Sequence, residues 1–149
     1  MDDTHVTDPV YTAGMTDGEV VRRLRAGETG VLALARADDA YAVPVSYRYV
    51  DGAIRFRLAD DGHSRKLAFA DATAEACFVV YGYEGPRESW SVIATGPIRA
   101  LSAEEWGADP ADVAERYTPL RVFDEAIEDT ELRGYELRIE QITGRRTTG

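Results

Sequence analysis

The segment that decides the fold is a strand, a two-residue turn and a second strand. It reads Tyr41-Ala42-Val43-Pro44-Val45-Ser46-Tyr47-Arg48-Tyr49-Val50-Asp51-Gly52-Ala53-Ile54-Arg55-Phe56-Arg57-Leu58. β-branched and aromatic residues dominate residues 41–50, and Asp51-Gly52 is a turn dipeptide typical of hairpins. Residues 54–58 alternate apolar and charged side chains, as a half-buried strand does. The segment therefore predicts a β-hairpin with one face in the core.

A proline interrupts the first strand of this hairpin. Pro44 has no N–H to give to a neighbouring strand, and proline within sheets is confined to edges, strand starts and bulges. Either the strand has an edge at Pro44, or something other than a neighbouring strand occupies that position. Both alternatives leave an open backbone next to Val45 and Ser46.

More strands and short helices surround the hairpin. Thr16-Asp17-Gly18-Glu19 has the spacing of a capping box, which predicts a helix that ends near Gly27. Gly96-Pro97 predicts a bend of the kind that closes a barrel. The other predicted strands are Thr29–Ala35, Ala74–Tyr83, Trp90–Leu101 and Tyr135–Ile142, and the other predicted helices are Ser64–Ala70, Ser102–Trp106, 110–117 and 122–127.

This order of elements predicts a mostly β protein. Five strands precede the helical insert and one follows it, with short turns between most of them. The pattern favours a six-stranded antiparallel split β-barrel with peripheral helices. Residues 1–15 are expected to be a flexible N-terminal arm, and residues 16–149 a single domain.

Composition narrows the functional class. The chain has 149 residues, 44% of them hydrophobic, which suffices for one domain with a core. It contains neither an apolar run long enough to span a bilayer nor the start of a signal peptide, so we expect a cytoplasmic protein. Cys77, the single cysteine, lies in an apolar run and is expected to be a small buried hydrophobe rather than a catalytic thiol.

The net charge of −10 argues against partners that need a basic face. Nucleic acid and anionic membrane surfaces are therefore not expected as partners. Acidic side chains outnumber basic ones by 27 to 17, and Lys66 is the only lysine. Such a surface is typical of proteins from salt-loving organisms, a hypothesis that unfolding in low and high salt would test.

The segment Gly62-His63-Ser64-Arg65-Lys66 is a candidate phosphate site. It combines a glycine, a hydroxyl and two adjacent cations at a predicted helix start. Backbone N–H groups, the helix dipole and formal charge together suit a phosphate dianion. The alternative is a solvated helix start with no ligand.

Several runs resemble one family in their order along the chain, from about Thr16 to Arg146. These runs are Gly30–Leu34, Tyr41–Tyr47, Phe56–Ala59, Gly62–Leu67, Ser91–Gly96 and Ile142–Arg146. The resemblance is to the pyridoxamine 5′-phosphate oxidase-like split-barrel flavoproteins, and within them to nitroimidazole-resistance-type, flavin-nucleotide-binding members. It implies an FMN-binding homodimer with each flavin at the subunit interface.

The resemblance also implies a set of cofactor-binding residues. The flavin ring lies beside the second and third strands, and its phosphate meets the basic residues at the following helix. The expected contacts are Val45, Ser46 and Tyr47, then Leu58 and Ala59, then His63, Ser64, Arg65 and Lys66, and finally Trp90 and Ser91. His63 is alternatively a loop-packing residue, and Trp90 a dimer-core residue. A solvated tail is favoured for Arg145 and Arg146 over a contact with flavin or a substrate anion.

Three functions follow as hypotheses. The first is a flavin-dependent oxidoreductase that takes electrons from a small-molecule donor and passes them to a small planar acceptor such as a nitro compound or a quinone. The second is a carrier, store or sensor of flavin nucleotide without turnover. The third is a split barrel that holds the deazaflavin F420 or haem. Vitamin B6 oxidation is disfavoured. The chain is shorter than true pyridoxamine phosphate oxidases, and it lacks their C-terminal basic and aromatic pattern. Catalytic residues are not assigned, and no zinc-ligand spacing is present.

Overall fold

The computed structural model of the chain describes residues 12–60, 65–106 and 131–147. The helices predicted at 110–117 and 122–127 lie outside these residues. So do His63, Ser64 and residues 1–11 of the predicted arm.

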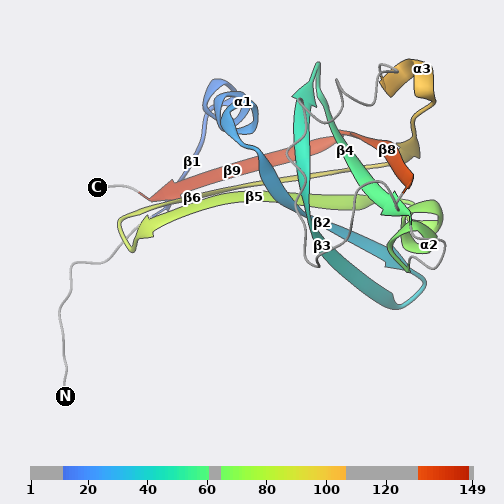
Figure 1. The fold of residues 1–149 in the computed structure, drawn as a ribbon. Helices are drawn as coiled ribbons and strands as arrows, with labels where there is room; N and C mark the ends of the chain where they lie inside the picture. Colours follow the sequence, from blue (N-terminus) through green and yellow to red (C-terminus); the bar gives the residue numbers. More distant parts are fainter. Residues whose placement is uncertain (1–11, 61–64, 107–130, 148–149) are drawn as a thin grey trace.

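Antiparallel strands make up most of the described chain, in one nine-stranded sheet of order β1-β9-β6-β5-β2-β3-β4-β8-β7. The mostly β, antiparallel split-barrel class predicted from the sequence is confirmed, with more strands than the six expected. The strands are Thr12–Gly14 (β1), Thr29–Arg36 (β2), Asp39–Val50 (β3), Ala53–Asp60 (β4), Ala76–Gly85 (β5), Glu88–Gly96 (β6), Ile98–Ala100 (β7), Glu131–Arg138 (β8) and Gln141–Thr147 (β9); the helices are Asp17–Ala26 (α1), Arg65–Ala72 (α2) and Ala103–Trp106 (α3) (Figure 1).

Local signals account for the elements around the hairpin. Thr16 accepts a hydrogen bond from the N–H of Glu19 (3.2 Å), and the Glu19 carboxylate accepts one from the N–H of Thr16 (3.3 Å), so the predicted capping box is confirmed. Asp51 and Gly52 both have positive φ, of 45° and 80°. That pair of conformations matches the strand twist in a tight hairpin turn, as the dipeptide predicted.

The described end of the predicted arm belongs to the sheet. Thr12–Gly14 forms β1 and pairs with the end of β9. Met15 continues this contact, because its N–H donates to the carbonyl oxygen of Gly144 over 2.8 Å. The extent of the arm before residue 12 and the single-domain organisation of residues 16–149 stay predictions.

One of the predicted strands was wrong in its boundaries. The run Tyr135–Ile142 is not a single strand, because β8 ends at Arg138 and β9 begins at Gln141. The alternation of apolar and polar residues slips by one where two polar residues, Glu140 and Gln141, stand together. After this shift the apolar side chains would lie on the opposite face of a continuous strand, which indicates that one strand ends and another begins there.

The break between β8 and β9 lies beside the break between β6 and β7. Pro97 interrupts the long strand predicted from Trp90 to Leu101, as the Gly96-Pro97 dipeptide indicated. The N–H of Arg138 donates to the carbonyl oxygen of Pro97 (3.0 Å), and that of Glu140 to the carbonyl oxygen of Thr95 (2.9 Å). The β6–β7 and β8–β9 connections therefore turn at one corner of the sheet. On one side of this corner β6 pairs with β9, and on the other side β7 pairs with β8.

The core lies on the inner face of the sheet, with α1 and α2 packed at its ends. Two aromatic pairs organise it: Phe56 and Tyr135 stack with ring centroids 5.9 Å apart, and Tyr47 and Phe78 meet edge to face at 5.0 Å. The largest fully buried side chains are Tyr135, Phe56, Phe69, Phe78, Leu24, Leu32, Ile54, Leu137 and Val92.

Four charged residues hold α3 against the second half of the sheet. Arg99 pairs with Glu105 (2.7 Å) and with Glu136 (3.3 Å), and Arg55 pairs with Glu136 (3.1 Å). Two hydrogen bonds lower the pKa of the Glu105 carboxyl to about 2. The larger cause is the bond from the Arg99 side chain, and the second is the bond from the backbone N–H of Ser102. Glu105 therefore stays charged over the whole range of ordinary pH.

Tyr47 fastens α1 to the sheet. Its hydroxyl donates to the carbonyl oxygen of Leu24 over 2.7 Å, in a buried position near the end of α1. We expect Tyr47→Phe to lower the free energy of unfolding by about 1–2 kcal/mol at neutral pH, because the Leu24 carbonyl loses its partner away from water. Urea unfolding followed by circular dichroism measures this difference.

The same substitution has a pH dependence with a definite sign. Burial raises the pKa of the Tyr47 phenol from 10.0 to about 12. The folded state favours the protonated phenol, so its contribution to stability is fully present below pH 10.0 and is lost as the pH rises towards about 12. We therefore expect the stability difference between wild type and Tyr47→Phe to narrow between pH 10 and 11. A difference that stays constant over that interval would contradict this account.

Candidate functional site

The two strands of the hairpin diverge and leave one edge of β3 open. β3 pairs with β2 along 39–46, whereas its pairing with β4 covers only Tyr47–Val50. On its other edge β4 pairs with β8 along its whole length, from Ala53 to Asp60, and among the described residues no pairing with β3 continues beyond Phe56. Within the described residues, the 39–46 edge of β3 that faces away from β2 therefore has no strand partner. Both alternatives that Pro44 left open agree with this arrangement, and what lies at this edge stays a prediction.

The direction of the backbone along β3 explains how the proline is accommodated. The N–H of Tyr47 donates to the carbonyl oxygen of Glu28 (3.0 Å), on the β2 side. Residues in a strand alternate in direction, so Val45 also faces β2, while Pro44 and Ser46 face the open edge. The N–H that Pro44 lacks would have pointed away from β2, and the ladder loses no hydrogen bond.

The predicted flavin contacts on these strands are buried. Val45, Ser46 and Tyr47 are each 4% exposed, and Leu58 is 2% exposed. Tyr47 already uses its N–H and its hydroxyl within the protein. The side chain of Ala59, like His63 and Ser64, lies outside the described residues.

Cations gather at the start of α2. Arg65 is exposed and Lys66 is half-buried, and the first turn of this helix contains no acidic residue. The guanidinium carbon of Arg65 lies 5.2 Å from the ring centroid of Phe69. A second guanidinium, that of Arg36 at the end of β2, lies 4.7 Å from the same ring. First-turn N–H groups without helical partners add to the positive potential there.

Sequence reasoning missed Arg36, Tyr41 and Phe69 at this end of the molecule. Tyr41 stacks on Phe69 with ring centroids 5.5 Å apart, and Arg65 lies 5.8 Å from the Tyr41 ring. The three missed residues come from β2, β3 and α2. Their sequence separation is too large for any helical or strand period, so no local pattern joins them.

Trp90 occupies a different environment, under α1. Its ring lies 4.5 Å from the guanidinium carbon of Arg23, and it stands opposite Gly82 on β5. A side chain at Gly82 would collide with the indole, so this glycine makes room for Trp90. Trp90 packs against the core, a position that fits its alternative role in packing as well as a cofactor contact.

The C-terminal arginines are part of a strand rather than of a solvated tail. Arg145 and Arg146 lie in β9, opposite Ser91 and Trp90 of β6. Arg146 pairs with Glu19 of α1 over 2.9 Å, and the pKa of Glu19 is lowered first by the N–H of Thr16 and then by Arg146. The favoured prediction for these two residues was therefore wrong, because β9 extends the sheet further than the sequence indicated.

The predicted site residues form two groups at opposite ends of the sheet. α2 carries Arg65 and Lys66 just before β5 begins, whereas Trp90 pairs near the end of β5. Gly82 lies six positions after Ala76 on β5, which corresponds to about 20 Å along a strand. Figure 1 shows α2 beside the start of β5 and α1 well away from it, above the left part of the sheet.

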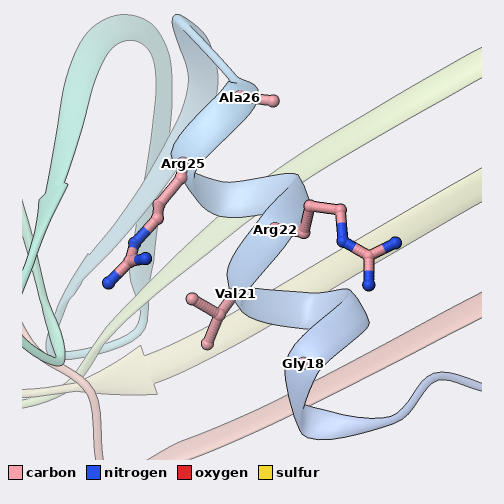
Figure 2. Close-up of a pocket in the computed structure, with 5 residues that line it drawn as sticks. All are labelled: Gly18, Val21, Arg22, Arg25 and Ala26. Carbon is pink, nitrogen blue, oxygen red and sulfur yellow. The ribbon is translucent and has the colours of Figure 1, made fainter.

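Two surface hollows are lined by residues of neither group. One, of about 500 Å³, is lined by α1 alone, and Figure 2 shows its Arg22 and Arg25 side chains pointing to different sides of the helix. The other, of about 220 Å³, lies between Pro97, Arg99 and Glu136. Divergent side chains do not converge on a ligand, so the first hollow is a weak candidate for a site.

The described residues give little support for a metal site or a reactive thiol. They contain no group of three or more His, Cys, Asp and Glu side chains placed to hold a metal ion. Cys77 is half-buried rather than fully buried, and burial, with Glu75 as a smaller cause, raises the pKa of its thiol. A raised pKa keeps the thiol protonated and unreactive at neutral pH. Among the same residues, none of the helices is long and apolar enough to cross a membrane.

Comparison with known proteins gives a family and a fold. A family model described as pyridoxamine 5′-phosphate oxidase matches residues 16–146. None of the curated proteins matches the chain.

Solved structures with the same fold share little sequence with this chain. A candidate pyridoxamine 5′-phosphate oxidase from Corynebacterium glutamicum has a TM-score of 0.69 at 19% identity, over 93% of this chain and 100% of that one. A FAD-binding protein from Mesorhizobium loti has a TM-score of 0.69 at 21% identity, over 93% and 99%. A candidate 5-nitroimidazole antibiotic resistance protein from Bacteroides thetaiotaomicron has a TM-score of 0.67 at 12% identity, over 98% and 96%. At these identities the likeness concerns the fold.

Proposed function

The chain belongs to the pyridoxamine 5′-phosphate oxidase-like family over residues 16–146, and from this premise we propose that it is a flavoprotein that binds FMN, free or as part of FAD, and transfers electrons to a small planar acceptor. The observation that carries the proposal is the 39–46 edge of β3 at Pro44, which has no second strand partner among the described residues, together with the cations Arg65 and Lys66 on the helix that follows β4.

The residues at this place suit the two chemically distinct ends of a flavin nucleotide. Arg65 and Lys66 offer a planar bidentate donor and a compact point charge, which complement each other on a phosphate. Among the described residues, neither is paired with a carboxylate, so both charges are available. The backbone along the 39–46 edge of β3 suits the polar pyrimidine edge of a flavin ring. The FAD-binding protein from M. loti, which shares this fold, supports a flavin as the ligand.

The flavin, when bound, supplies the redox chemistry itself. Arg65 and Lys66 would hold the phosphate, and the edge of β3 would orient the ring. A backbone N–H of this edge directed at the ring would stabilise negative charge that develops there on reduction. A protein nucleophile is not required for this role.

An absorption spectrum of the gently purified protein, followed by heat release and identification of the chromophore, tests the proposal. We expect FMN or FAD. A deazaflavin spectrum or an intense Soret band would replace the flavin with F420 or haem. A colourless protein that also fails to bind added FMN would overturn the proposal. Mixing the reduced protein with nitro compounds and quinones then separates an oxidoreductase from a carrier, because a carrier is reoxidised no faster than free flavin.

We also propose that the protein acts as a homodimer. The outer face of β5 and β6 exposes large apolar side chains: Tyr81 and Tyr83 are each 65% exposed, and Ile93 is 42% exposed. Val79 lies between Val31 and Ile93 in the register and extends the same apolar face. Exposed apolar patches of this kind mark interaction surfaces.

Ile93→Asp is expected to convert the dimer to a monomer at micromolar concentration, because a buried unpaired carboxylate at the interface costs several kcal/mol. Size-exclusion chromatography with light scattering measures the mass. Arg22→Gln on α1, which changes the net charge by the same amount, should leave the dimer intact. A wild type that is monomeric with flavin fully bound would remove the dimer from the proposal.

A further inference from the structure

Two arginines from different elements share one aromatic platform. Arg36 ends β2 and Arg65 begins α2, and their guanidinium carbons lie 4.7 and 5.2 Å from the centroid of the Phe69 ring. Phe69 is fully buried, and Tyr41 stacks on it beside Arg65. The buried ring fixes where both guanidinium groups lie, which reduces the side-chain entropy that a ligand contact would cost.

Charge at this place is unbalanced. Both arginines are exposed, and in the described ranges neither has a carboxylate partner, although the chain as a whole carries a net charge of −10. Guanidinium groups that stack on a ring keep their N–H edges free for planar, bidentate contacts with phosphate. The guanidinium groups of Arg36 and Arg65 at the Phe69 ring can therefore donate hydrogen bonds to two neighbouring phosphates rather than to one.

We propose that Arg36 is a specificity residue that, beside Arg65, binds a second phosphate, so that the protein prefers a flavin with a diphosphate, as in FAD, over FMN. The inference rests on the proposed function, since it extends the same phosphate site. FMN carries its charge on a single phosphate, which Arg65 and Lys66 would bind. A diphosphate spreads a similar charge over two phosphates, and Arg36 would bind the second one.

Calorimetric titration of the purified protein with riboflavin, FMN and FAD tests the proposal. We expect FAD to bind more tightly than FMN in the wild type, and Arg36→Gln to raise the Kd for FAD about tenfold and that for FMN less than about twofold, because one charge-assisted contact is lost from FAD alone. Arg36→Lys should recover part of the FAD affinity, and Arg22→Gln, an exposed arginine of α1, should change neither Kd.

The outcomes separate this inference from the proposed function. Equal effects of Arg36→Gln on FMN and FAD, or none on either, overturn the role of Arg36 and leave a flavin protein. Failure of the wild type to bind any of the three flavins overturns both. If Arg36→Gln does not fold, displacement of FMN from the wild type is measured with inorganic pyrophosphate and inorganic phosphate. Pyrophosphate is expected to act at lower concentration, and equal potency overturns the second phosphate site.

Discussion

Replacing Arg65 and Lys66 together with alanine is expected to raise the Kd for FMN about 100-fold, while the Kd for riboflavin changes by less than about threefold. Hydrogen bonds to charged groups contribute about 1.5–3 kcal/mol each, and the loss of about 3 kcal/mol corresponds to a factor of about 100. Only FMN carries a phosphate, so only FMN loses these contacts. Titration of both ligands into the double variant, at one fixed salt concentration, measures the two constants.

A matched control separates a local effect from a general loss of positive charge. Arg22 and Arg25 lie on α1, at the opposite end of the sheet from α2. Their double replacement by alanine removes the same charge and should leave the FMN affinity within about twofold of wild type, because the distance exceeds the screening length of about 10 Å. Equal losses of FMN and riboflavin affinity in the Arg65/Lys66 variant would remove the start of α2 from the site.

Gly96→Ala is expected to lower the free energy of unfolding by more than about 4 kcal/mol, or to prevent folding altogether. A Cβ at Gly96 would collide with the carbonyl oxygen of Arg138, at the corner where β8 ends. The obstacle is backbone, and that backbone is fixed by the bond from the N–H of Arg138 to the carbonyl oxygen of Pro97 (3.0 Å). Relief therefore requires the two halves of the sheet to move apart.

Gly18→Ala provides the control for this substitution. A Cβ at Gly18 meets nothing within 4 Å, and the residue lies in α1, where alanine is favoured over glycine by up to about 1 kcal/mol. Its stability should therefore equal or slightly exceed that of the wild type in urea unfolding. Similar stabilities of the Gly96 and Gly18 variants would show that the corner tolerates a side chain and that the barrel is not closed there.

Local chemistry predicted the elements whose signals lie within a few residues. The capping box at Thr16, the positive-φ turn at Asp51-Gly52 and the interruption at Pro97 each depend on neighbouring residues, and the structure confirms all three. The family resemblance is confirmed as well, because it rests on the order of such signals along the chain. The predicted strand Tyr135–Ile142 was wrong, because it spans the end of β8 and the start of β9. The alternation of apolar and polar residues shifts by one residue between these two strands.

The candidate site depended less on local signals. The sequence indicated an open backbone at Pro44 and cations at Arg65 and Lys66, and among the described residues Pro44 has no strand partner on the side away from β2. It gave no means of finding Arg36, because the contact with Phe69 joins residues 33 positions apart. It also grouped Trp90 with Lys66, although the two lie at opposite ends of β5.

The sequence by itself determined the class of fold, the hairpin, the helix starts and the residue types available for a phosphate. Only the tertiary structure decided where β3 and β4 part, which backbone groups face the open edge, and which arginines share an aromatic ring. The physical reason is that turn chemistry and side-chain periodicity act between neighbours in the chain, whereas register and packing depend on which distant surfaces bury each other most completely.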